Sequence, residues 1–273
     1  MSIIEQQLFL FKRKLETAIT SSGMKGKISL IRSSELIELI HDAVKQEFID
    51  YGVNPLNICP RLGQTSPEIK LAGLLKQKDQ DVCLLPSGIS KEKTVISWGP
   101  MAFENREDEF GERFTENTLV VNIRSQMSSI AKNADTLFER TFAEAMNLHM
   151  KYPNIVLGEV YLIPVFEYDD NAIKTKRICF KKQPTNIERY ISFFDSINNR
   201  KRNGEVYKYE RCCLLLVDFS KNRPKLFTSS EELKSAGLLS KDFKIEYSTL
   251  NFAFFAQDLL NEYGVRFNLA NLL

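Results

Sequence analysis

The spacing of apolar residues predicts two helices at the start of the chain. Residues 3–21 and 34–50 follow the helical period, with apolar side chains recurring every three or four positions. Ser33-Ser34-Glu35 precedes the second segment and resembles a helix-capping signal. Residues 51–77 are rich in proline and glycine, so we expect a loop that leads into a short helix.

Strand-like segments dominate the middle of the chain. Three of them are expected, at Val82–Leu85, Thr94–Trp98 and Leu119–Ile123. An amphipathic helix over about 133–150 follows, and then an apolar run in which Pro164 favours an edge strand or a strand end. The predicted order is therefore helix, three strands, helix, strand.

The C-terminal part of the chain predicts an attached subdomain of mixed structure. Its expected elements are a helix at Thr185–Asn198, a buried strand at Arg211–Phe219, a short helix after the capping pattern at 229–232, and a helix at Ser248–Tyr263. Gly264 is the expected stop of the last helix.

Composition restricts the classes of protein that are possible but does not indicate a function. The 37 basic and 35 acidic residues give a formal charge of +2, so nucleic-acid binding would need locally concentrated positive charge. The five cysteines lack metal-ligand spacing, which argues against zinc and fits a reducing compartment. Neither a long apolar run nor a signal-type N-terminus is present, so we expect a cytoplasmic protein without membrane contact.

Polar residues gather where the strand-like run at 119–123 meets the long helix. They are Asn122, Arg124, Ser125, Gln126, Ser128 and Ser129. Many nucleases place their metal and phosphate chemistry at such a junction, whereas ordinary capping is the simpler interpretation.

The helical period separates the acids of the long helix. At 100° per residue, Glu144 and Asp135 fall at the margins of the apolar face, while Glu139 and Arg140 point toward solvent. Glu144 can therefore either reach a neighbouring strand end or pair with Arg140 four residues earlier. His149 lies on the apolar side and is expected to pack.

The local sequence resembles the PD-(D/E)XK nuclease superfamily, notably type II restriction endonucleases that read CTCGAG-like sites. In that family a strand ends in Glu-x-Lys-Ser-Gln, and a following helix carries an arginine and a Glu-Ala pair. The counterparts are Asn122-Ile123-Arg124-Ser125-Gln126, then Asn133, and then Arg140 and Glu144-Ala145. The resemblance covers about residues 78–165.

The resemblance implies an α/β fold with a restriction-endonuclease-like αβββαβ core and a mixed central sheet. The core is expected at 76–170. A helical N-terminal region at 1–75 and a C-terminal α+β subdomain at 171–273, used for DNA recognition or dimerisation, would flank it.

The resemblance also implies a Mg²⁺ site. Asp81 matches the leading acid, with Asp79 as its competitor. Asn122 stands where the second acid is expected and would bind the metal ion through a neutral carbonyl oxygen. The second acid is therefore expected from the helix, at Glu144 or else Glu139. Arg124 occupies the lysine position, where it can stabilise phosphate charge but cannot act as a base. Residues expected to contact DNA are Ser125, Gln126, Ser128, Lys132 and Asn133.

The implied activity is metal-dependent cleavage of double-stranded DNA at a specific sequence by a homodimer, paired with a DNA methyltransferase in the same system. The basic segments at 174–182 and 200–211 offer local positive charge for DNA. The alternative is a catalytically degenerate DNA-binding or assembly subunit, since the second acid and the lysine are both replaced. An α/β interaction protein unrelated to nucleic acid is the third hypothesis.

Overall fold

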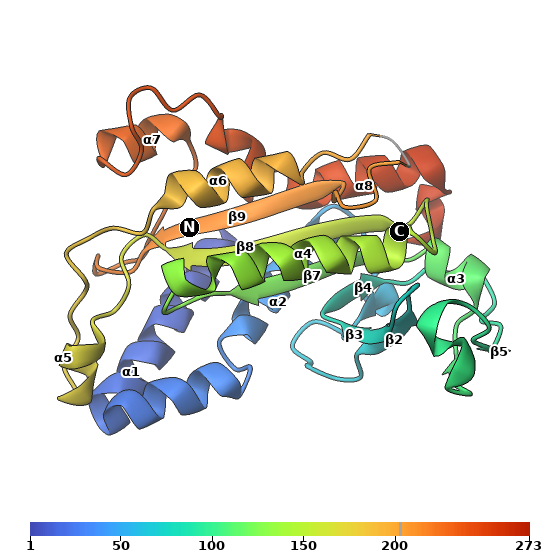
Figure 1. The fold of residues 1–273 in the computed structure, drawn as a ribbon, viewed down its shortest axis with the longest axis horizontal. Helices are drawn as coiled ribbons and strands as arrows, with labels where there is room; N and C mark the ends of the chain where they lie inside the picture. Colours follow the sequence, from blue (N-terminus) through green and yellow to red (C-terminus); the bar gives the residue numbers. More distant parts are fainter. Residues whose placement is uncertain (202–203) are drawn as a thin grey trace.

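A six-stranded mixed sheet forms the centre of the molecule (Figure 1). The computed structural model describes residues 1–201 and 204–273. In spatial order the strands are β1 (Ile58–Cys59), β4 (Val82–Leu84), β7 (Leu119–Ser125), β8 (Val156–Pro164), β9 (Arg211–Asp218) and β10 (Lys225–Leu226). β7, β8 and β9 run parallel, whereas β1, β4 and β10 pair antiparallel with their neighbours. Inner parallel strands are buried on both faces, which explains their apolar sequences.

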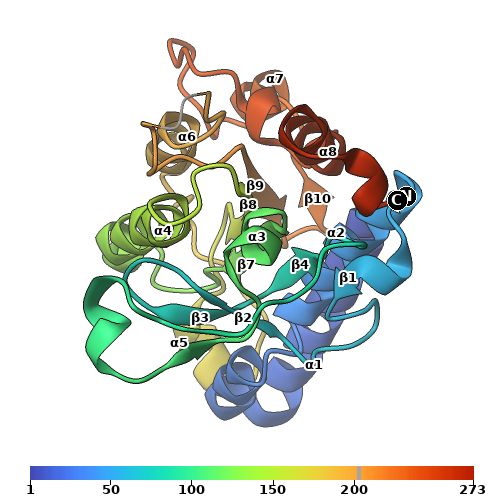
Figure 2. The ribbon, with the colours of Figure 1, turned by 90° about the vertical axis from the view of Figure 1, so that its right-hand side faces the viewer.

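Helices cover both faces of this sheet (Figure 2). One face packs against α4 (Ala134–His149) and α6 (Ile187–Ser196). The other packs against α1 (Ile3–Arg32), α2 (Ile37–Asp50) and α8 (Phe255–Arg266). The predicted α/β class, with a helical N-terminal region and a mixed sheet, is confirmed.

The first helix is longer than its sequence pattern predicted. α1 continues past residue 21 because Gly23, with φ 58° and ψ −136°, lets the chain kink and resume the helix. Ser2 caps its start by accepting a hydrogen bond from the Glu5 backbone N–H. The cap predicted at 33–35 is wrong, because α2 begins after Leu36 without a side-chain cap.

Two predictions for the middle of the chain are also wrong. The short helix expected before residue 77 is instead a hairpin of the largely buried β2 (Ile69–Ala72) and the polar β3 (Gln77–Gln80). Of the segment Thr94–Trp98, only β5 (Thr94–Val95) is a strand, and it pairs with β6 (Glu107–Asp108) outside the central sheet. Short α3 (Glu112–Glu116) follows.

The regions 1–75, 76–170 and 171–273 all contribute to one sheet. β9 pairs with β8 along seven residues, and α8 packs on the same hydrophobic core as α1 and α2. Pro164 ends β8, as one predicted alternative required, but β8 is an inner strand and not an edge. Short α5 (Asp170–Lys174) lies in the connection after β8.

The C-terminal helices agree only partly with the sequence pattern. Ser229 caps α7 (Ser230–Ser235) by accepting a hydrogen bond from the Glu232 backbone N–H, as predicted. The last helix starts later than expected, after Phe254 adopts the left-handed conformation, and it runs through Gly264 to Arg266. In the described part of the chain no helix has the length and apolar character needed to cross a membrane.

Candidate functional site

Three oxygen-bearing side chains form a row across neighbouring strands. Asn122 of β7 pairs in register with Glu159 of β8. Asp81 stands directly before β4, which is antiparallel to β7, and its Oδ2 accepts a hydrogen bond from the Ile123 backbone N–H at 2.7 Å. Side chains opposite one another on paired strands share a face of the sheet. Asp81, Asn122 and Glu159 therefore lie together on the face that α4 covers.

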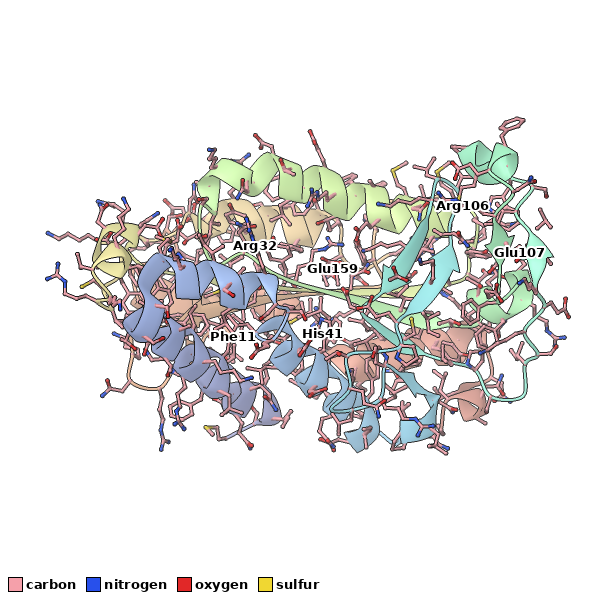
Figure 3. All side chains as sticks on the ribbon, turned by 90° about the horizontal axis from the view of Figure 1, so that it is seen from below. Phe11, Arg32, His41, Arg106, Glu107 and Glu159 are labelled. Atoms are coloured by element: carbon pink, nitrogen blue, oxygen red, sulfur yellow. The ribbon has the colours of Figure 1, made fainter. Side chains whose placement is uncertain are left out.

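The oxygens of this row are buried and poorly satisfied. Asn122 is 2% exposed and Glu159 is fully buried. Glu159 Oε1 lies 3.1 Å from Arg124 Nη1, whereas no well-aligned hydrogen bond reaches Asn122 Oδ1 or Glu159 Oε2 from the described residues. Figure 3 shows Glu159 between α4 and the N-terminal helices. Buried acceptors without donors cost free energy unless a cation compensates them, and Arg124 already does so for one oxygen of Glu159.

Two basic side chains border the row. Arg124 forms ion pairs with Glu159, at 3.1 Å between Nη1 and Oε1, and with Glu144 of α4. Lys78 of β3 reaches the same Glu144 carboxylate, at 2.8 Å between Nζ and Oε2. The cluster thus combines three acids with two cations, a composition that fits a phosphate and a divalent cation together.

Helix α4 presents its side chains much as the sequence predicted. Glu144 is half-buried at the margin of the apolar face, while Glu139 and Arg140 are exposed. The expected pairing of Glu144 with Arg140 is replaced by the pairs with Lys78 and Arg124. The marginal position of Glu144 therefore does bring it to the strand row.

The β2–β3 hairpin reaches the site because α4 holds its turn. The buried Asn147 side chain accepts hydrogen bonds from the backbone N–H groups of Leu75 at 2.7 Å and Lys76 at 3.1 Å. Its amide nitrogen also donates to the Lys76 carbonyl at 3.1 Å. These bonds fix the turn that precedes β3, and with it the position of Lys78.

Burial shifts the pKa of one carboxylate and of one ammonium group in the cluster. Burial raises the pKa of Glu159 to about 7, against the opposing charges of Arg124 and Lys78. Burial, reinforced by the charge of Arg124, lowers the pKa of Lys78. A lysine with a lowered pKa can exchange a proton more readily than an arginine.

The structure separates the two candidate leading acids. Asp81 belongs to the row, whereas Asp79 is exposed and pairs with Lys70 at 3.7 Å. His41 of α2 lies close enough to Asp81 to feel its charge, and burial lowers the pKa of this imidazole. Its Nε2 has no hydrogen-bond partner among the described residues.

The residues predicted to contact DNA lie beyond the row. Ser125 ends β7, and Gln126 and Ser128 follow it, with the Gln126 amide donating to the Ser128 carbonyl. Lys132 and Asn133 precede α4, roughly 16–18 Å along the helix axis from Glu144 at the usual rise per residue. They are not brought into the cluster.

The two basic segments differ in availability. The first, at 174–182, leaves several exposed cations, namely Lys174, Lys176, Arg177 and Lys182. The second is largely internal, because Arg200 is buried against Glu210 and Arg211 is buried against Asp258. Arg202 lies outside the described residues.

His149 belongs to a separate buried cluster with a packing role. Its Nε2 lies 3.4 Å from Glu210, which also pairs with Arg200 and Arg266. Burial opposes ionisation of Glu210, but the hydrogen bond and charge of His149, with Arg266, lower its pKa to about 2. This carboxylate ties α4 and α8 to the start of β9, and its charge is already compensated.

The oxygens of the row fit the predicted magnesium ion only if the asparagine takes part. Within residues 1–201 and 204–273, no three aspartate, glutamate, histidine or cysteine side chains form a group that could hold a metal ion. Asp81 and Glu159 supply two carboxylates, and Asn122 supplies an amide oxygen without a donor. Magnesium accepts such oxygen ligands and keeps several waters, so this donor set is chemically suitable.

Sequence reasoning missed Glu159 and Lys78. Glu159 was visible as a single acid inside an otherwise apolar strand, a pattern that signals a buried charge with a partner elsewhere. Lys78 gave no comparable signal, because β3 is polar throughout. Comparison with known proteins adds no candidate, since no protein-family model, curated protein or solved structure matches the chain.

Proposed function

We propose that the protein is a Mg²⁺-dependent endonuclease that cuts double-stranded DNA at a specific sequence, as type II restriction endonucleases do. The row of Asp81, Asn122 and Glu159, bordered by Lys78 and Arg124, carries the proposal. Oxygen ligands beside two cations suit a hard metal ion and a phosphodiester at one place.

Each residue of the cluster has a role in this proposal. Asp81, Asn122 and Glu159 would hold the metal ion, which when bound would polarise a phosphate oxygen and acidify a water. Arg124 faces the scissile phosphate and stabilises the charge that develops on it. Lys78 orients the attacking water and can exchange a proton with it, because its pKa is lowered.

Glu144 remains a rival metal ligand, nominated from its place on the helix. In the structure its carboxylate contacts Lys78 and Arg124, so we assign it to holding these two cations. We favour Glu159 as the metal ligand because it is fully buried beside Asn122 and no well-aligned hydrogen bond reaches its Oε2 from the described residues.

The order of elements around the row also supports the proposal. β4 is antiparallel to β7, α4 follows β7, and β8 returns parallel to β7, which resembles part of the expected nuclease core. Palindromic DNA sites call for two-fold symmetry, so a homodimer is the expected active form. A DNA methyltransferase in the same system would protect the host sites.

Digestion of a large phage DNA with Mg²⁺ or Mn²⁺ tests the proposal, with EDTA as the control. We expect discrete fragments only when metal is present. A gel shift without cutting would instead support a degenerate DNA-binding subunit. Asn122 in place of the family's acid and Arg124 in place of its lysine favour that alternative. If the protein neither cuts nor binds DNA, both DNA-based functions are overturned.

A further inference from the structure

Arg124 occupies the position of a counter-ion inside the cluster. Its guanidinium pairs with Glu159 through Nη1, pairs with Glu144 through Nη2, and donates from Nη1 to the Thr141 hydroxyl at 3.3 Å. Glu159 is fully buried and has no other cation at ion-pair distance among the described residues. The charge of Glu159 is therefore compensated by the side chain that a phosphate would also attract.

We propose that Arg124 acts as an internal cation that weakens metal binding until DNA withdraws it. The inference rests on the proposed function, because it assigns to DNA the phosphate that competes for the guanidinium. Guanidinium groups bind phosphate in a bidentate manner, at least as well as carboxylate. When Arg124 turns to a phosphate, the buried Glu159 carboxylate loses its ion-pair partner, and Lys78 still contributes positive charge at longer range.

An uncompensated buried carboxylate has a strong preference for a new cation. A divalent metal ion entering between Asp81, Asn122 and Glu159 supplies that charge and uses the free oxygens. DNA and metal ion therefore strengthen each other's binding, and by thermodynamic linkage the two effects are equal in size. Lys78 pairs with Glu144 and not with Glu159, so the proposed exchange concerns Arg124.

The experiment compares Mn²⁺ binding to EDTA-stripped full-length protein by calorimetry, for wild type, Arg124→Gln and the exposed control Arg140→Gln. Without DNA, Arg124→Gln is expected to bind Mn²⁺ about 10-fold more tightly or better, the usual size of such coupling. Arg140→Gln should match wild type. Equal affinities in all three proteins would overturn the inference.

The second arm adds sonicated phage DNA and replaces Mn²⁺ by Ca²⁺ to limit cutting. Wild type should then gain at least about 5-fold in Ca²⁺ affinity, while Arg124→Gln gains little. A similar gain in both proteins would overturn the coupling even if DNA cleavage is found. Failure to bind DNA at all would count against the proposed function. Tighter Mn²⁺ binding by Arg124→Gln would still show that Arg124 opposes the metal ion.

Arg124→Lys covers the case in which Arg124→Gln does not fold. Lysine keeps the charge but cannot bridge Glu144 and Glu159 together, so its Mn²⁺ affinity should lie above that of wild type. If Arg124→Gln is unfolded without metal, thermal melting should show that Mn²⁺ restores its fold. Unchanged Mn²⁺ affinity in Arg124→Lys would contradict the inference.

Discussion

Glu159 gives the site a pH dependence that can be measured without DNA. Its pKa is raised from 4.5 to about 7, so the folded carboxyl holds its proton more tightly than the unfolded one. Between pH about 4.5 and about 7 the unfolded state binds fewer protons, and the free energy of unfolding therefore falls as pH rises. Above about pH 7 the free energy of unfolding falls no further through this group.

Glu159→Gln should remove this pH-dependent loss. In EDTA, the stability of the variant relative to wild type is expected to rise from pH 4.5 to 7.5, by at most about 3 kcal/mol. Urea unfolding at several pH values measures the difference, and the exposed Glu139→Gln should track wild type throughout. Parallel curves for Glu159→Gln and wild type would show that Glu159 is not destabilised by its burial.

Among the single residues of the site, the sequence identified some and not others. Glu144 could be placed because the helical period fixes which side chains of α4 reach the sheet. Glu159 could not be paired with Asn122 from sequence, because the contact depends on the register between β7 and β8. Strand register is a tertiary property, set by packing on both faces.

Among the elements, the link between α4 and the β2–β3 hairpin governs where Lys78 lies. Asn147→Ala removes three hydrogen bonds to the hairpin turn and leaves the Leu75 and Lys76 backbone N–H groups without this side-chain acceptor. We expect a loss of about 2–3 kcal/mol in the free energy of unfolding. The exposed Asn261→Ala on α8 should change stability by less than about 0.5 kcal/mol. A loss for Asn147→Ala no larger than this control would contradict the anchoring role.

The kink in α1 depends on a single glycine. Gly23 has a positive φ, and a Cβ there would stand 3.0 Å from the Ile173 carbonyl oxygen. Gly23→Ala is therefore expected to lower the free energy of unfolding by about 1–3 kcal/mol. Gly264→Ala in α8 is the matched control, because its Cβ would meet no atom closer than 3.7 Å. This second change should be neutral or stabilise by up to about 1 kcal/mol. Thermal melting of both variants makes the comparison, and equal destabilisation would refute the account of the kink.

The sequence predicted those elements that carry a helical apolar period or a continuous apolar run. The helices α2 and α4 show the period, the strands β7, β8 and β9 the run, and each was expected near its observed bounds. The hairpin was missed because β3 reads Gln-Lys-Asp-Gln and has no apolar alternation. Its pairing with β2 and the bonds from Asn147 hold it in place, and neither leaves a local signal.

In the whole molecule, the three expected regions all contribute to the central sheet. β9 extends the central sheet, and α8 closes the same core as the N-terminal helices. The sequence suggested an attached subdomain because β9 lies about 50 residues beyond β8. A parallel strand needs a long crossover connection, and such spacing is hard to distinguish from a domain boundary.

The modest net charge of +2 is compatible with DNA binding because the free cations are unevenly placed. Exposed basic residues lie at 174–182 around α5, whereas Arg200 and Arg211 are buried and form ion pairs within the protein. Binding of phosphate by this segment would be weakened by salt in proportion to the number of contacts.

We propose that Asp81, Asn122 and Glu159 form the metal-binding centre of a DNA-cutting enzyme. The most direct measurement is the rate at which wild type, Glu159→Gln and Glu139→Gln cut phage DNA in Mg²⁺. We expect wild type and Glu139→Gln to give the same discrete fragments at similar rates. Glu159→Gln should cut at least about 100-fold more slowly, with DNA binding largely retained. Cutting by Glu159→Gln at the wild-type rate would contradict the account.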